Sequence, residues 1–154
     1  MITFGIDPGF GGAIAELHPD GTMYVHDMPT VPGAKGKTEL AMRAACDLLD
    51  AGGEKAVVWL ERVGARPGQG VSSMFRFGQQ LGALEMAVAA HGHELRYVTP
   101  ATWKKHYGLS ADKGAARGMA MQRDPANAAL YQRVKDDGRA EAALIALYGA
   151  GVAA

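Results

Sequence analysis

The chain has 154 residues, of which 48% are hydrophobic, and a formal net charge of zero. This length and composition predict one globular domain over residues 1–154, and the single Cys46 excludes a disulfide within the chain and a cysteine zinc site. No apolar run reaches the ~18 residues of a membrane span. Since a signal-peptide pattern is also absent, we expect a cytoplasmic protein without membrane contact.

Charge is distributed unevenly along the chain. Residues 1–61 hold nine acidic residues and four lysines or arginines, whereas residues 62–154 hold seven acidic residues and twelve lysines or arginines. Between residues 96 and 123, six basic residues accompany the single acid Asp112. A local basic surface of this kind is typical of nucleic-acid binding, although a solvated helical face would give the same pattern.

The first part of the chain predicts consecutive strands. Apolar runs over residues 2–7, 12–18 and 22–27 are joined by tight turns and are therefore expected to pair as an antiparallel meander. After a loop rich in proline and glycine, the spacing of apolar residues predicts a helix over 39–50 with Thr38 as its cap.

The remainder of the chain predicts alternating strands and helices. Residues 56–61 form a continuous apolar run, which is typical of a central strand buried on both faces. The expected elements that follow are a helix from Ser72 or Ser73 to about 90, a strand over 95–98, a helix over 101–107, a basic helical hairpin and a last helix over about 138–148. This order predicts an α/β fold with a mixed five-stranded sheet flanked by helices.

Acidic residues stand at the ends of predicted elements. Asp7 ends the first strand, Glu61 ends the fourth, and Asp136 and Asp137 precede Glu141 at the start of the last helix. Asp137 and Glu141 are one helical turn apart and face the same way. Convergent carboxylates favour Mg²⁺ or Mn²⁺, although Asp7 alone could be a turn aspartate bonded to its own backbone.

Short motifs surround these acidic residues and cover nearly the whole chain. They are Gly5-Ile6-Asp7-Pro8-Gly9 with Gly12-Ala13, Leu60-Glu61-Arg62-Val63, Gly68-Gln69-Gly70-Val71-Ser72-Ser73, Phe77-Gly78-Gln79-Gln80-Leu81-Gly82, Thr99-Pro100-Ala101-Thr102-Trp103-Lys104 and Asp137-Gly138-Arg139-Ala140-Glu141-Ala142. In this order, the motifs resemble the ribonuclease H-like fold and, within it, the RuvC-type Holliday junction resolvases, particularly their phage-encoded relatives.

The resemblance implies a homodimeric endodeoxyribonuclease that resolves four-way DNA junctions by paired nicks, without a nucleotide cofactor. Two divalent cations, Mg²⁺ or Mn²⁺, would serve phosphodiester hydrolysis. Their ligands would be Asp7, Glu61, Asp137 and Glu141. Asp136 is the alternative to Asp137, and Arg139 is expected to screen the helix acids rather than to contact phosphate.

The resemblance also implies residues that contact DNA. Lys104 and Lys113 match lysines that the family places near the scissile phosphate, where they would take part in catalysis. The expected DNA contacts are Arg66, Gln69, Ser72, Ser73, Arg76, Lys104, Lys105, Lys113 and Arg117. The family often has an aromatic residue three positions after the glutamate. This chain has Gly64 there, and Phe75 and Phe77 are expected in the core.

Two other functions are compatible with the sequence. A phosphotransferase or ATPase of the actin and sugar-kinase type uses a similar glycine turn after its first strand, but that class has two such domains and this chain has room for one. A non-catalytic DNA-binding or recombination scaffold could keep the fold, although retention of all four acidic residues argues against a lost site.

Overall fold

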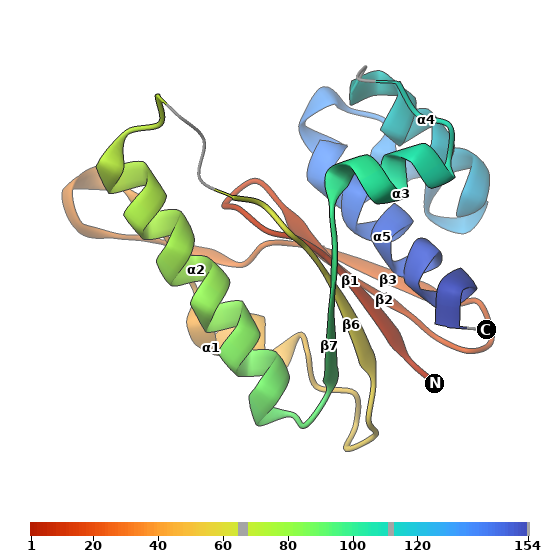
Figure 1. Cartoon of the computed structure of the whole chain (residues 1–154), viewed down its shortest axis with the longest axis horizontal. Helices are drawn as coiled ribbons and strands as arrows, with labels where there is room; N and C mark the ends of the chain where they lie inside the picture. Colours follow the sequence, from red (N-terminus) through yellow and green to blue (C-terminus); the bar gives the residue numbers. More distant parts are fainter. Residues whose placement is uncertain (65–67, 111–112, 154) are drawn as a thin grey trace.

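The computed structural model describes residues 1–64, 68–110 and 113–153, with the backbone alone of residues 113 and 153, and its central feature is a twisted sheet (Figure 1). Five strands lie in the order β3-β2-β1-β6-β7. They are β1 (Thr3–Asp7), β2 (Ala13–Leu17), β3 (Met23–Asp27), β6 (Val57–Glu61) and β7 (Glu94–Val98). The first three pair antiparallel, whereas β6 and β7 run parallel to β1. This arrangement confirms the predicted mixed sheet.

The segment after β3 differs from the prediction. It forms a short hairpin of β4 (Thr30–Pro32) and β5 (Thr38–Leu40), with the 3₁₀ turn η1 (Ala34–Gly36) at its tip, and helix α1 spans only Met42–Asp47. The helix predicted over 39–50 is therefore present but shorter, and its predicted beginning with a cap at Thr38 is wrong. Thr38 instead pairs across the hairpin, where a β-branched side chain fits well, and helix formation starts only after Ala41.

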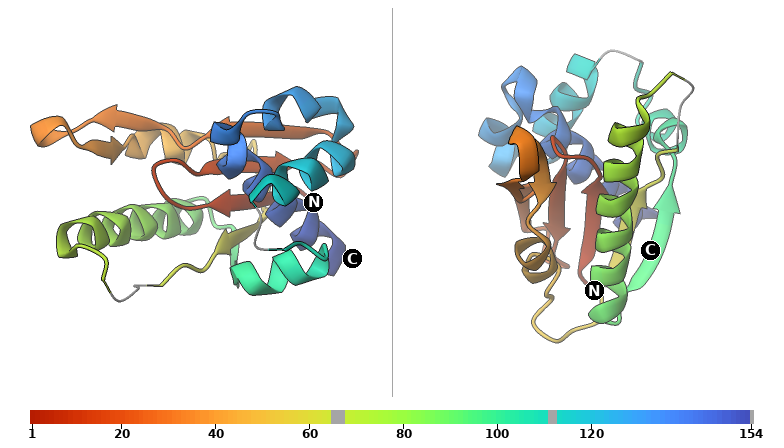
Figure 2. Two further views of the ribbon diagram at one scale, coloured as in Figure 1. Left: turned by 90° about the horizontal axis from the view of Figure 1, so that it is seen from above. Right: turned by 90° about the vertical axis from the view of Figure 1, so that its left-hand side faces the viewer.

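Helices cover both faces of the sheet (Figure 2). Helix α2 (Val71–Ala90) lies with α1 on one face, while α3 (Pro100–His106), α4 (Lys113–Arg123) and α5 (Asp137–Ala153) lie on the other. Two 3₁₀ helices, η2 (Pro125–Tyr131) and η3 (Val134–Asp136), lead into α5, which is longer than expected. No helix of the described residues is long and apolar enough to cross a membrane.

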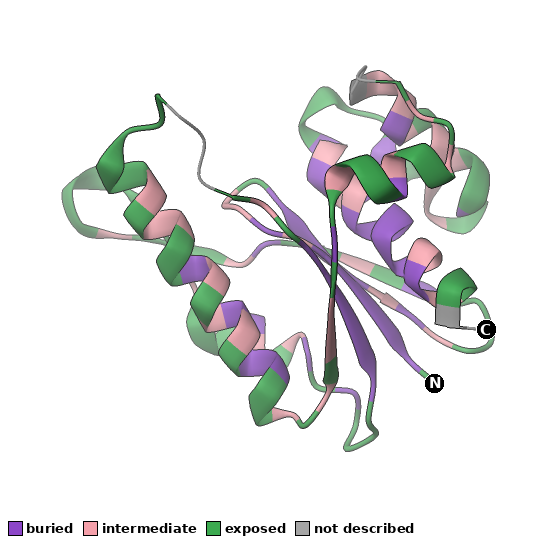
Figure 3. Ribbon diagram, in the orientation of Figure 1, coloured by how far each residue is buried: buried purple, intermediate pink, exposed green. Residues whose placement is uncertain are grey.

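Strand alternation builds two hydrophobic clusters, one on each face of the sheet. Phe4 and Ile6 of β1 belong to the cluster beneath α1 and α2, whereas Trp59 of β6 belongs to the cluster beneath α5. The strands between the two helical layers are buried along most of their length (Figure 3). By the same alternation, Asp7 and Glu61 lie on the α5 face.

Helix α5 lies very close to β1 and to the turn that follows it. A Cβ atom on Gly5 would stand 2.3 Å from the carbonyl oxygen of Ala142, and one on Gly138 would stand 2.4 Å from that of Gly11. Only glycine permits so close an approach of two backbones. The close packing therefore fixes the beginning of α5, with Glu141 in its second turn, over the end of β1.

Candidate active site

Three carboxylates from three elements converge at one edge of the sheet. Asp7 ends β1, Glu61 ends the neighbouring parallel strand β6, and Glu141 comes from α5. Each offers one oxygen atom, and these oxygens all lie within 4.8 Å of one another. We call these three residues the acidic cluster. Its position follows from the fold, because parallel neighbours end at the same edge of a sheet.

The acidic cluster holds an excess of negative charge over positive charge among the described residues. Burial raises the pKa of Asp7 well above its usual value, and the carboxylates of Glu141 and Glu61 raise it further, while Lys104 lowers it. An all-oxygen donor set with an excess of negative charge is what Mg²⁺ and Mn²⁺ prefer. The residues present therefore fit a divalent cation.

Helix α3 contributes two side chains to this site. Lys104 Nζ donates a hydrogen bond to Glu141 Oε1 at 2.9 Å, and Trp103 Nε1 donates one to Glu61 Oε1 at 2.7 Å. Trp103 is fully buried, so its indole N–H requires an acceptor, and this bond orients the Glu61 carboxylate. Sequence patterns do not single out Trp103, although its place beside Lys104 in the Thr99–Lys104 motif was an available signal.

The two consecutive aspartates before Glu141 have different partners. Asp136 is 2% exposed and accepts hydrogen bonds from the backbone N–H and the guanidinium of Arg133, which lower its pKa. Asp137 begins α5 and forms an ion pair with Arg117, with 2.9 Å between Oδ1 and Nε. Asp137 does not belong to the group of carboxylates whose oxygens lie within 4.8 Å of one another. Asp136 is thus held in structural contacts, whereas Asp137 lies one helical turn before Glu141.

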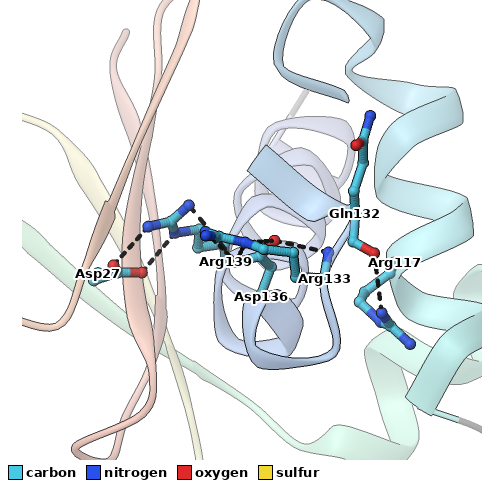
Figure 4. Close-up of polar contacts among 6 residues, drawn as sticks. All are labelled: Asp27, Arg117, Gln132, Arg133, Asp136 and Arg139. Carbon is cyan, nitrogen blue, oxygen red and sulfur yellow. Dashed lines mark hydrogen bonds and ion pairs between the residues drawn. The ribbon is translucent and has the colours of Figure 1, made fainter. Parts of the chain in front are cut away.

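Arg139 ties the beginning of α5 to the sheet (Figure 4). Its Nε and Nη2 atoms each donate to a carboxylate oxygen of Asp27 at 2.6 Å, and its Nη1 atom lies 3.8 Å from Asp136 Oδ1. Asp27, Arg133, Asp136 and Arg139 together form what we call the arginine network. Arg139 therefore has a structural role, as expected, but its partners are Asp27 and Asp136 rather than the acids on its own helix.

The basic residues predicted to contact DNA have different surroundings. Lys104 is half-buried beside the acidic cluster, and Lys105 is exposed on the same helix. Arg117 on α4 is half-buried and occupied by its ion pair and by a hydrogen bond to a backbone carbonyl. Arg66 and the side chain of Lys113 lie outside the described residues.

The polar residues predicted to contact DNA lie at or just before the start of α2. They are Gln69, Ser72, Ser73 and Arg76. Gln69, Ser73 and Arg76 line a cavity of about 290 Å³ with Phe10 and Gly64. The Arg76 guanidinium lies over the Phe10 ring, 4.9 Å from its centroid, and donates to a backbone carbonyl of β5. Arg76 therefore links α2 to the hairpin and to the turn after β1.

The prediction that Phe75 lies in the core is wrong, because 67% of its surface is exposed. Leu84, nine residues along α2, is fully buried against the sheet. Nine residues correspond to two and a half helical turns, which places Phe75 on the opposite side of the helix. Phe77 is half-buried and lines the cavity that contains Gln69 and Ser73.

Comparison with solved structures supports the predicted fold. A structure of Thermus thermophilus RuvC has a TM-score of 0.61 and 16% identity, covering 99% of this chain and 97% of that one. T. thermophilus RuvC in complex with a Holliday junction substrate has a TM-score of 0.64 and 14% identity, covering 99% and 96%. The yeast mitochondrial Holliday junction resolvase Ydc2 has a TM-score of 0.52 and 17% identity, covering 94% and 75%.

These likenesses confirm the predicted ribonuclease H-like fold of the RuvC type, and their low identities limit that conclusion to the fold. No protein-family model matches the sequence. No curated protein sequence matches it either. Assignment of function therefore depends on the chemistry of the acidic cluster and its surroundings.

Proposed function

We propose that this protein is a metal-dependent endodeoxyribonuclease of the RuvC type, which resolves four-way DNA junctions as a homodimer. The observation that carries the proposal is the convergence of Asp7, Glu61 and Glu141, with oxygens within 4.8 Å of one another. Branched DNA is the substrate class because one structural neighbour is RuvC in complex with a Holliday junction substrate.

The acidic cluster would hold divalent cations, with Asp137 as a further ligand one helical turn before Glu141. Two bound cations would activate a water molecule on one side of the phosphodiester and stabilise the leaving oxygen on the other. Within the protein, the Trp103 indole holds Glu61 in one orientation. Lys104 supplies a fixed positive charge beside the cluster, where it would offset charge that develops on the phosphate.

The outer face of α2 supports the proposed homodimer. Val71, Phe75 and Met86 are 86%, 67% and 69% exposed, and they follow one side of the helix. Gly78 and Gly82 lie between them on the same side, which allows the backbone of a second helix to approach closely. A two-fold axis would bring two copies of this face together and supply the second active site that paired nicks require.

Sedimentation of the wild-type protein and of Phe75→Glu tests the dimer. We expect the wild-type protein to sediment as a dimer and the variant as a folded monomer, because the glutamate places two charges at the interface. The monomer should lose its preference for junctions over linear duplex, since it offers only one basic surface. A monomeric wild-type protein that still makes symmetric paired nicks would contradict this part of the proposal.

Incubation with a synthetic four-way junction and Mg²⁺ tests the activity. We expect paired nicks in the junction, little cleavage of a linear duplex of equal length, and no cleavage in EDTA. ATP hydrolysis without DNA cleavage would instead identify a phosphotransferase-type activity. Junction binding without cleavage in either Mg²⁺ or Mn²⁺ would identify a non-catalytic scaffold.

A further inference from the structure

A cavity of about 310 Å³ lies between α2 and the β4–β5 hairpin, a volume at the lower end of the range of small-molecule sites. We call it the hairpin cavity. Its lining includes Phe10 from the turn after β1, Lys35 and Lys37 from the hairpin, and Arg76 and Gln80 from α2. No residue of the acidic cluster lines it, so it is a separate feature of the molecule.

Gln80 is the group that points to a ligand. Its side chain is only 2% exposed, and within residues 1–64, 68–110 and 113–153 neither its amide nitrogen nor its amide oxygen has a hydrogen-bond partner. A buried amide without partners is unfavourable, and nearly all buried polar groups in proteins are paired. Its position on the lining of a cavity indicates that the missing partner is a molecule that enters there.

The chemistry of the amide identifies the class of partner. A glutamine side chain presents a hydrogen-bond donor and an acceptor next to each other, and this pair matches the edge of a nucleobase. The best-defined pairing joins the amide to N6 and N7 of adenine. An adenine base would satisfy both unpaired atoms of Gln80 at once, whereas a simple anion or an apolar molecule would satisfy one of them or neither.

The other lining residues favour a nucleotide over a free base. Among the described lining residues, Lys35, Lys37 and Arg76 contribute positive charge against one acid, Glu39, which favours a bound phosphate. Lys37 also donates a hydrogen bond to Ser72 at the start of α2, so the hairpin and the helix are joined beside the cavity.

The hairpin cavity adjoins the surface that is predicted to contact DNA. Phe10 and Arg76 line both this cavity and the smaller one that contains Gln69 and Ser73. Phe10 also follows Asp7 by only three residues. A nucleotide in the hairpin cavity would thus belong to a strand bound close to the acidic cluster.

We propose that the hairpin cavity binds an unstacked nucleotide, with the Gln80 amide pairing with the base and with adenine as the preferred base. The DNA source of that nucleotide rests on the proposed function, because the base pairs at the exchange point of an open four-way junction lack a stacking neighbour on one side and open more easily than those of a linear duplex. A free adenine nucleotide has the same chemistry, and the test distinguishes the two sources.

The test uses two probes in EDTA, so that binding is measured without cleavage. One is deoxyadenosine monophosphate, followed by calorimetry. The other is a four-way junction in which 2-aminopurine stands next to an adenine at the exchange point, so that the adenine keeps its N6 amino group and its unstacking changes the fluorescence of its neighbour. For the wild-type protein, we expect a change in 2-aminopurine fluorescence on binding. Gln80→Leu keeps the approximate size of the side chain and removes both polar atoms. It should lose the fluorescence change and bind the junction about tenfold more weakly.

Two further variants sharpen the result. Gln122→Leu makes the same chemical change at an exposed position of α4 and should behave like the wild-type protein. Gln80→Leu should unfold at an equal or higher temperature, because an unpaired buried amide has been removed. If that variant does not fold, Gln80→Met keeps the unbranched shape and replaces it in the comparison.

The outcomes separate the two sources and the two proposals. A fluorescence response in the junction identifies DNA as the source, whereas binding of the mononucleotide alone identifies a free nucleotide. A response of equal size in wild-type protein and Gln80→Leu, or no binding of either probe, would overturn the proposal. Because no probe is cleaved in EDTA, failure of the proposed nuclease activity would leave this result unchanged.

Discussion

The acidic cluster and the arginine network both lie near the beginning of α5, and they shift the pKa values of their carboxylates in opposite directions. In the cluster, burial and neighbouring carboxylates raise the pKa of Asp7. In the network, hydrogen bonds from Arg139 lower the pKa of Asp27, and those from Arg133 lower the pKa of Asp136. The arginine network has its counter-charges within the chain. In the acidic cluster, by contrast, three acids face Lys104 among the described residues, so the cluster is suited to an added cation. The partners of an acidic residue therefore distinguish a structural residue from a candidate metal ligand.

Replacement of Asp7 by asparagine should have the largest effect and should separate activity from stability. We expect junction cleavage to fall by about 10³-fold or more, because bound metal ions contribute several kcal/mol to such reactions. In EDTA, the same variant should be more stable than the wild-type protein, by about 1.4 kcal/mol for each unit by which the pKa of Asp7 is raised. Cleavage assays test the loss of activity, and thermal unfolding of the metal-free proteins tests the gain in stability.

The stability gain should depend on pH. Because the pKa of Asp7 is higher in the folded than in the unfolded chain, the folded protein holds more protons, and its stability falls as pH rises from the usual to the raised pKa. Asp7→Asn lacks this loss, so its advantage in EDTA should grow with pH over that interval. An advantage that stays constant or shrinks would contradict an uncompensated charge at Asp7.

Replacement of Asp136 by asparagine should have the reverse effects, a loss of stability with little change in activity. Loss of its charged hydrogen bonds to Arg133 should destabilise the protein by about 2–3 kcal/mol, while cleavage per folded molecule stays within a few-fold of wild type. The contribution of Asp136 to stability is present at neutral pH and is lost as pH falls through its lowered pKa. Asp137→Asn is the matched comparison and should lose activity rather than stability. If Asp136→Asn lost activity and Asp137→Asn kept it, the metal ligand would be Asp136 rather than Asp137.

Replacement of Trp103 by phenylalanine should have a smaller effect, confined to the chemistry. The variant keeps an aromatic ring and loses the N–H that orients Glu61, so we expect the rate of cleavage to fall about 10- to 100-fold with junction affinity unchanged. Trp59→Phe is the control, because the buried Trp59 Nε1 has no hydrogen-bond partner among the described residues. Equal rates for these two variants would show that the Trp103 hydrogen bond does not serve catalysis.

Local patterns in the sequence predict the strands, and the resemblance to the ribonuclease H-like fold predicts that the strands ending in Asp7 and Glu61 are neighbours. Apolar runs define the strands, and an acid at the end of each of two parallel neighbours must reach the same edge. The hairpin at Thr38 escapes prediction because its pairing depends on residues across a turn. The sequence could favour Asp137 over Asp136 as a metal ligand. It could not explain the difference between them, because their partners include Arg117, which is twenty residues away in the chain.

Thermal unfolding during a titration with Mg²⁺ tests most directly whether the acidic cluster is the cation site. A cation that binds the folded protein raises its unfolding temperature by mass action. We predict similar increases for the wild-type protein and for Asp136→Asn, and no increase for Asp7→Asn. An increase of equal size in Asp7→Asn, or its loss only in Asp136→Asn, would contradict the assignment of the divalent cation to Asp7, Glu61 and Glu141.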